Sequence, residues 1–292
     1  MPVYESTVDN VLGSDAEFQA YVQDYEAAIL ASGFLEVAPD TGQLNPLTIA
    51  KPAVVSTWAG YRIYRATDAM APTKPIYIKV EYGVGAAVDR FAVRRTTATG
   101  TNGAGTLTGV TSAVGSIHAP SISGGGTGMI YGGGNESHMW LMTWDTGQPT
   151  HCSFWMCGRL IDQDDGESDE PVFWDFFTAT SSSTLAGAYQ WTDGSTAWAV
   201  NSSGVYEHLP NLGHAINTGG DVNTILLYQG MVYRNAKTKV FPFLAGRAAE
   251  LPFTDPAGSQ FNLNLWGASR TFLAIPFSAV ISGMRIAVLW EE

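Results

Sequence analysis

The stretch Lys74–Gly109 reads KPIYIKVEYGVGAAVDRFAVRRTTATGTNGAGTLTG and predicts a β-sheet fold. From Ile76 to Tyr82 every second residue is Ile, Val or Tyr, which is the two-residue period of a half-buried strand. Two glycines end this run, and a second alternating run follows from Val88 to Arg95. The Gly- and Thr-rich stretch Thr99–Gly109 then shows no helical pattern. We therefore predict a strand, a turn, a second strand and a long surface loop.

The composition of the whole chain is typical of a sheet-rich protein with few charges. Hydrophobic residues make up 45% of the 292 residues, whereas charged residues make up only 14%, against roughly 25% in an average soluble domain. This profile fits surfaces that pack against neighbouring molecules, and it also fits an ordinary β-protein with uncharged loops. The net charge is −12 with only 15 Lys and Arg. Because nucleic-acid binding depends on neutralising phosphates, we predict no nucleic-acid partner.

From about Leu47 onward the pattern is all-β, and we predict an antiparallel β-sandwich, jelly-roll-like, with one N-terminal amphipathic helix. No long helical pattern separates the candidate strands, which excludes parallel βαβ units. Asp193-Gly194 between two aromatic runs predicts a hairpin turn. The candidate strands are Ala53–Thr57, Gly60–Ala66, Ile76–Tyr82, Arg90–Thr96, His138–Trp144, His151–Ile161, Val172–Thr178, Ala186–Trp191, Thr196–Asn201, Asn223–Arg234, Gln260–Trp266, Phe272–Pro276 and Arg285–Leu289.

The first 48 residues differ from the rest of the chain. Ser14 and Glu17 have the spacing of a capping box, an apolar stripe follows at helical spacing, and Gly33 is a natural helix end. The stripe either covers the chain's own sheet or inserts into a neighbouring subunit. We take residues 1–48 as a candidate docking segment and 49–292 as the β body. The candidate interaction residues are Phe18, Tyr21, Val22, Tyr25 and Ile29.

Residues 109–134 are rich in Gly, Ser and Thr, with triple-Gly runs at 124–126 and 132–134. Such a stretch is a flexible linker, a long loop, or a crossing where backbones approach closely. We favour a single sandwich with a long excursion here. Division of the body into two sub-domains is the alternative.

The second half of the chain is unusually aromatic. Trp140 and Trp144 are four residues apart and share one strand face with Met142 between them. Such a face is most simply part of a sandwich core. The functional alternative is an aromatic platform that stacks on sugar rings.

Two groups of residues suggest weak metal sites, although we predict no cofactor. The acidic stretch Asp162–Glu170 fails the EF-hand pattern, because Gly stands at position 5 and Phe at position 12. A solvated hairpin tip is the simplest interpretation, with a looser calcium site as the alternative. Its ligands would be Asp162, Asp164 and Asp169. A second metal site with few ligands would combine Asp145 with His138 and His151, which would face each other across a hairpin.

Motifs for catalysis are missing from the sequence. It contains no Gly-x-Ser-x-Gly nucleophile elbow and no P-loop lysine, so we predict that the protein is not an enzyme. Cys152 and Cys157 are five residues apart and fall on opposite faces of a strand. We predict free thiols, which fits synthesis in a reducing cytoplasm. The start of the chain shows no signal peptide. The sequence contains no run of about 18 apolar residues, so we predict no membrane partner.

The segment from about Trp58 to Gly109 resembles one that recurs in structural proteins of tailed-bacteriophage particles. There a Lys-Pro, an apolar strand and Tyr-Gly-Val-Gly precede a Gly-Thr-rich loop. Here the corresponding loop is Gly100–Gly109, GTNGAGTLTG.

The resemblance implies a non-enzymatic virion protein that works through wide contacts with copies of itself and with other virion proteins. Within the particle we favour the tail apparatus (neck, collar, baseplate or fibre attachment) over capsid decoration. A carbohydrate-binding β-sandwich, with a host surface glycan as partner, is the alternative from another class. A glycan-cleaving enzyme is a third.

Overall fold

The fold is that of a computed structural model in which strands dominate. It describes residues 3–118, 126–146, 152–162, 168–178, 187–189, 198–200, 231–234, 237–240, 245–248, 260–265, 268–276 and 285–291.

The sequence that predicts the fold forms one antiparallel sheet, which we call the meander sheet. Each strand pairs antiparallel with the next along the chain. This sequential order differs from the crossing connections of a jelly roll, so that detail of the prediction is corrected. The strands are β2 (Leu35–Val37), β3 (Trp58–Ala66), β4 (Tyr77–Val84), β5 (Phe91–Thr101) and β6 (Leu107–His118).

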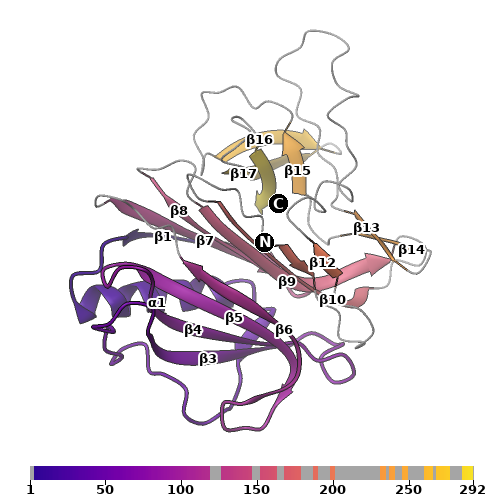
Figure 1. The fold of residues 1–292 in the computed structure, drawn as a ribbon. Helices are drawn as coiled ribbons and strands as arrows, with labels where there is room; N and C mark the ends of the chain where they lie inside the picture. Colours follow the sequence, from indigo (N-terminus) through magenta and orange to yellow (C-terminus); the bar gives the residue numbers. More distant parts are fainter. Residues whose placement is uncertain are drawn as a thin grey trace.

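A second antiparallel sheet, the central sheet, packs against the first and completes the predicted sandwich. In Figure 1 it runs across the middle of the molecule, with the C-terminal strands above it. Its path is β1 (Val3–Asp9), β7 (Thr127–Asn135), β8 (His138–Asp145), β9 (Cys152–Asp162), β14 (Lys237–Val240) and β13 (Met231–Arg234), and β10 (Ser168–Thr178) also pairs with β9. The C-terminal sheet has the order β15 (Ala245–Ala248), β18 (Arg285–Glu291), β17 (Ala268–Pro276) and β16 (Gln260–Leu265).

The predicted helix is α1 (Asp15–Leu30), and its capping box forms as expected. The Ser14 hydroxyl accepts from the Glu17 N–H at 3.3 Å, and the Glu17 carboxylate accepts from the Ser14 N–H at 2.8 Å. In Figure 1, α1 lies between the meander sheet and the strands β1, β7 and β8. Its stripe therefore faces apolar side chains of both sheets.

The docking role expected for this stripe is wrong, because the chain's own core buries all five side chains. None is more than 2% exposed (Phe18, Tyr21, Val22, Tyr25 and Ile29). The ring of Tyr21 stacks on that of Phe91 in β5, with centroids 4.0 Å apart. The stripe thus fills the sandwich, which was the other interpretation of the same pattern.

The first 48 residues are integrated into the β body and do not form a separate helical segment. Strand β1 pairs with β7 along its full length, and β2 pairs with β3. Both strands are short sheet edges, and their mixed polar and apolar sequences carry little alternation. A truncation that removes residues 1–33 would therefore remove a core helix and a sheet strand.

Much of the Gly-rich stretch 109–134 is strand, because β6 and β7 cover all of it except residues 119–126. At the second triple-Gly run, residues 132–134, the prediction of a crossing where backbones approach closely is confirmed. A Cβ built on Gly132 would lie 2.5 Å from the Ala28 carbonyl oxygen of α1. A Cβ on Gly133 would lie 2.8 Å from the Trp140 ring. Glycine lets the helix lie directly on the central sheet.

We expect Gly132→Ala to lower the free energy of unfolding by about 1–3 kcal/mol, the usual effect of overpacking. The added methyl meets backbone atoms of Ala28, which no rotamer change can move. Gly100→Ala is the matched control in a strand, because its Cβ meets only the Thr108 hydroxyl, at 2.8 Å. Urea unfolding followed by tryptophan fluorescence compares the two variants. An equal loss in both would contradict the close packing at Gly132.

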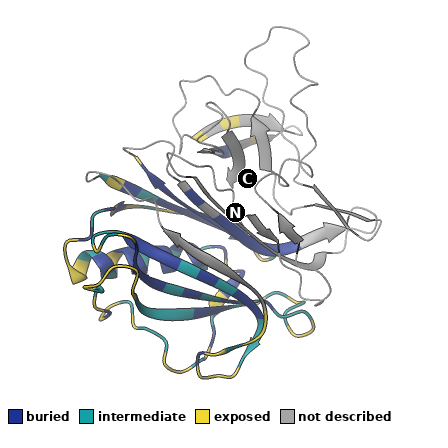
Figure 2. Ribbon diagram, viewed as in Figure 1, coloured by how far each residue is buried: buried dark blue, intermediate teal, exposed yellow. Residues whose placement is uncertain are grey.

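Strand β8 is buried on both faces (Figure 2). Met139 and Leu141 face α1 in the main core, whereas Trp140 and Trp144 point to the opposite side and are at most 8% exposed. Trp155 of β9 is also fully buried. These tryptophans therefore belong to the core, as the simplest interpretation held, and offer no platform for a sugar.

One expected strand is absent where the structure describes the chain: residues 53–57 form a surface loop. Ser56 has φ 55°, unusual for a residue other than glycine, and its N–H donates to the Gly85 carbonyl at 2.8 Å. The expected turn Asp193-Gly194 lies outside the described residues. The strands on either side of it, β11 (Gly187–Tyr189) and β12 (Trp198–Val200), pair antiparallel.

Candidate functional site

Several charged side chains lie near one another on the outer face of the meander sheet. Because side chains alternate along a strand, Ile78, Val80 and Tyr82 of β4 point into the core. Tyr77, Lys79 and Glu81 therefore point outward. Their cross-strand partners on β3 and β5 share that face.

The first set of outward residues crosses three strands. Arg65 stands directly opposite both Glu36 of β2 and Tyr77 of β4. Its Nε donates to Glu36 Oε1 at 2.6 Å. The hydrogen bond with Glu36 raises the pKa of Arg65, opposed by partial burial and supported by Tyr77. The guanidinium therefore stays charged and held beside the tyrosine.

Two further sets continue along the same face. Arg94 makes a bidentate pair with Glu81, at 2.6 and 2.7 Å, and its guanidinium carbon lies 4.9 Å from the Trp58 ring centroid. Lys79 Nζ lies 4.0 Å from the Tyr61 ring centroid, a cation–π distance. The outer face thus repeats one arrangement: a cation held beside an aromatic ring.

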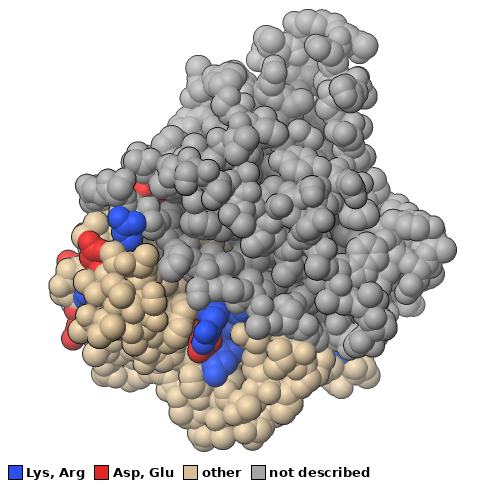
Figure 3. Space-filling model, in the orientation of Figure 1, with Lys and Arg blue, Asp and Glu red and all other residues tan. Residues whose placement is uncertain are grey.

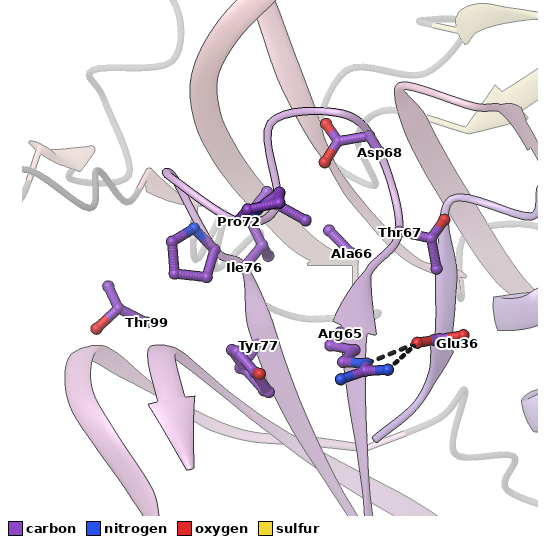
Figure 4. A pocket seen from close by; sticks show the side chains of 11 residues that line it. Glu36, Arg65, Ala66, Thr67, Asp68, Pro72, Ile76, Tyr77 and Thr99 are labelled. Atoms are coloured by element: carbon purple, nitrogen blue, oxygen red, sulfur yellow. Dashed lines mark hydrogen bonds and ion pairs between the residues drawn. The ribbon is translucent and has the colours of Figure 1, made fainter. Parts of the chain in front are cut away.

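A pocket of about 640 Å³ opens at the end of this face where β3 passes into β4. Figure 4 shows Glu36, Arg65 and Tyr77 side by side at its base, with Thr99 beside them and the loop of Asp68 and Pro72 around it. Its volume falls in the range of small-molecule sites, roughly 300–1,000 Å³. We refer to it as the Arg65 pocket.

The loop that borders the Arg65 pocket is held from two sides. Asp68 accepts from Arg159 Nε at 2.7 Å and from Nη2 at 2.9 Å, and the Arg159 side chain is fully buried. Thr67 donates through its N–H to Phe34 O and through its hydroxyl to Gly33 O, both at 2.9 Å. The pocket is therefore formed in advance of any ligand.

The Gly-Thr-rich loop within Gly100–Gly109 is shorter than expected. Strand β5 reaches Thr101 and β6 begins at Leu107, which leaves a tight hairpin. The Asp40 carboxylate accepts from the Thr101 hydroxyl at 2.9 Å and from the Gly105 N–H at 3.1 Å. Gly105 has φ +84°, and a Cβ there would overlap the Tyr61 hydroxyl. Both features require glycine at this position.

The structure separates the residues of the histidine site. His138 and Asp145 are the two ends of β8, seven residues and about 23 Å apart at the rise of a strand. They also point to opposite faces, so they cannot share a metal, and this expectation is wrong. Burial lowers the pKa of His138 to about 3, which keeps the imidazole neutral at pH 7. His151 lies outside the described residues.

The weak calcium site remains a prediction. Asp162 ends β9 and Asp169 lies in the paired strand β10, while Asp164 lies outside the described residues. Within the part of the chain that is described, no three His, Cys, Asp or Glu side chains come together as a metal site.

Cys157 is a free, fully buried thiol, as predicted. Burial raises its pKa well above the ordinary range, so it stays protonated and unreactive. Cys152 is the first residue of β9.

Comparisons with protein-family models, with curated proteins and with solved structures found no match. Among the described residues, no helix has the length and apolar character that crossing a bilayer requires.

The residues of the Arg65 pocket carried no signal in the sequence. Glu36, Arg65 and Tyr77 come from three strands, and each follows the ordinary alternation of its own strand. Only the pairing register brings them into one row. Sequence analysis could have found them only if the register of all three strands had been known.

Proposed function

We propose that this protein is a non-enzymatic structural component of a tailed-phage particle. It acts in the tail apparatus through contacts with copies of itself and with other virion proteins. The resemblance of residues 58–109 supports the phage assignment. The observation that carries an assembly role is a group of exposed valines on this same part of the fold, which we call the valine patch (Val54, Val55 and Val88).

The valine patch is built from two adjacent segments. Val54, Val55 and Val88 are 64%, 47% and 38% exposed. The loop that carries the first two is tied to the turn between β4 and β5 on both sides: Lys51 Nζ donates to Val88 O at 2.9 Å, and the Ser56 N–H donates to Gly85 O. In the same turn, the Asp89 carbonyl oxygen accepts a hydrogen bond from the Leu12 N–H at 2.8 Å.

Single exposed apolar residues are common and need no explanation, whereas a contiguous apolar group marks an interaction site. Three aliphatic side chains held on a fixed backbone need no ordering when a partner docks, which favours association. On the face shown in Figure 3, residues other than Lys, Arg, Asp and Glu make up most of the described surface. These features fit a surface that other subunits cover.

We expect the purified full chain to form a closed oligomer, and Val54→Asp/Val55→Asp to reduce it to monomer. Charges placed in an apolar interface must be desolvated without a partner, which opposes association. The measurement is size-exclusion chromatography with light scattering at several protein concentrations, with negative-stain imaging of the same peak.

The matched control is Val110→Asp. Val110 is also exposed, at 53%. It stands opposite Ala98 of β5, which stands opposite Tyr77 at the start of β4. The valine patch lies beyond the other end of β4, about 23 Å away along the strand. An oligomer lost equally in both variants, or a wild-type chain that stays monomeric, would count against the patch. Immunogold labelling of particles released by cells that carry this sequence tests the virion assignment itself, and unlabelled particles would overturn it.

A further inference from the structure

We propose that the Arg65 pocket binds a neutral saccharide ring. This inference stands apart from the assembly role, since it concerns the opposite end of the meander sheet from the valine patch. The tryptophans of β8 and β9 are buried and cannot contact a sugar, so the pocket takes the place of the expected aromatic platform.

The polar groups of the pocket match the chemistry of vicinal hydroxyls. Each sugar hydroxyl both donates and accepts, so a site that binds a pair of them needs donors and acceptors side by side. A guanidinium offers five N–H donors and a carboxylate about four acceptor sites, more than the pair between Arg65 and Glu36 uses. Side-chain exposures of 40% and 47% keep both groups in reach of a ligand.

The apolar part of the pocket matches the other face of such a ring. Tyr77 adjoins Arg65 at the base, and Pro72 and Pro75 line the wall beside it. Rigid apolar surfaces of this kind pack against the C–H groups of a ligand while a few polar groups fix its orientation.

Charge decides in favour of a neutral ligand. Both acids in the pocket, Glu36 and Asp68, are paired with an arginine. The pocket therefore carries no net charge from these groups to select a phosphate or an ammonium group. The chain's net charge of −12 further disfavours anions at long range.

The test begins with the full chain on an array of immobilised glycans of defined structure. The array contains neutral hexoses and N-acetylhexosamines beside uronic-acid and phosphorylated chains. We expect binding to neutral members. The tightest neutral binder is then titrated in solution by calorimetry against the wild type and three variants, with circular dichroism and thermal unfolding to confirm that each variant is folded.

Arg65→Ala and Tyr77→Ala are each expected to weaken binding at least about tenfold, the loss that follows removal of a charged hydrogen-bond donor or of an apolar surface. Arg94→Ala is the matched control, because it removes the same type of cation from an acid and an aromatic ring on the same sheet face, outside the pocket. Its affinity should stay within about twofold of the wild type.

Three results would overturn the proposal. They are no binding to any neutral glycan, equal losses in Arg65→Ala and Arg94→Ala, and binding confined to the anionic glycans. None of them bears on oligomer formation, so the assembly role is judged separately.

Discussion

Asp68→Ala is expected to lower the free energy of unfolding by about 3–5 kcal/mol, because it leaves the buried Arg159 guanidinium without its carboxylate. Arg159 is fully buried and Asp68 is 10% exposed, and the two form a bidentate pair. The pair joins the loop between β3 and β4 to β9 of the central sheet, 91 residues away. Loss of this carboxylate therefore weakens the contact between the two sheets and leaves a buried positive charge unpaired.

Urea unfolding of Asp68→Ala and of Glu81→Ala tests this expectation. Glu81 makes the same bidentate contact with Arg94, but those side chains are 18% and 38% exposed, and a solvated pair contributes only about 0–1 kcal/mol. The double variant Asp68→Ala/Arg159→Met should recover part of the loss, since it removes the unpaired charge. Equal losses in Asp68→Ala and Glu81→Ala would show that burial of Arg159 does not decide the effect.

The sequence predicted the regular elements because each follows a local rule. The alternation from Ile76 to Tyr82 specified β4 and its buried face, and the Ser14–Glu17 spacing specified the start of α1. The strand order did not follow from these local rules, because the meander sheet pairs its strands sequentially where a jelly-roll-like order was expected, and the central sheet pairs β1 with β7.

The elements that were missed depend on the rest of the fold. Strand β7 contains the second triple-Gly run, which has little intrinsic tendency to form a strand. It forms one because Gly132 allows α1 to lie against it and because β1 and β8 pair on its two sides. Close approach of a distant helix is not visible in a local pattern.

Buried charge was equally invisible. Arg94 and Arg95 are adjacent and looked alike in the sequence, yet alternation sends Arg94 outward to Glu81 and Arg95 into the core. Arg159 follows the aromatic run of β9, where its sequence position predicts an exposed arginine near the end of a strand. The partners that make their burial possible come from distant parts of the chain: Arg95 donates to Tyr25 of α1, and Arg159 donates to Asp68 in the loop between β3 and β4.

The second large effect is expected at Tyr25, whose hydroxyl is a shared acceptor inside the core. Arg95 Nη1 of β5 and Trp155 Nε1 of β9 both donate to it at 2.9 Å, and Tyr25 is 1% exposed. The hydroxyl therefore joins the helix to both sheets. Tyr25→Phe keeps the ring and removes only the hydroxyl, so apolar packing changes little.

We expect Tyr25→Phe to lower the free energy of unfolding by about 2–4 kcal/mol, since loss of the acceptor affects two buried donors and one of them is charged. Tyr61→Phe is the matched control, because the Tyr61 hydroxyl donates to Thr41 O at 3.2 Å at the surface, and its removal should cost under about 1 kcal/mol. Arg95→Met combined with Tyr25→Phe should cost less than the sum of the single changes, because an apolar side chain replaces the buried cation. Strict additivity would mean that the contribution of Arg95 to stability does not depend on the Tyr25 hydroxyl.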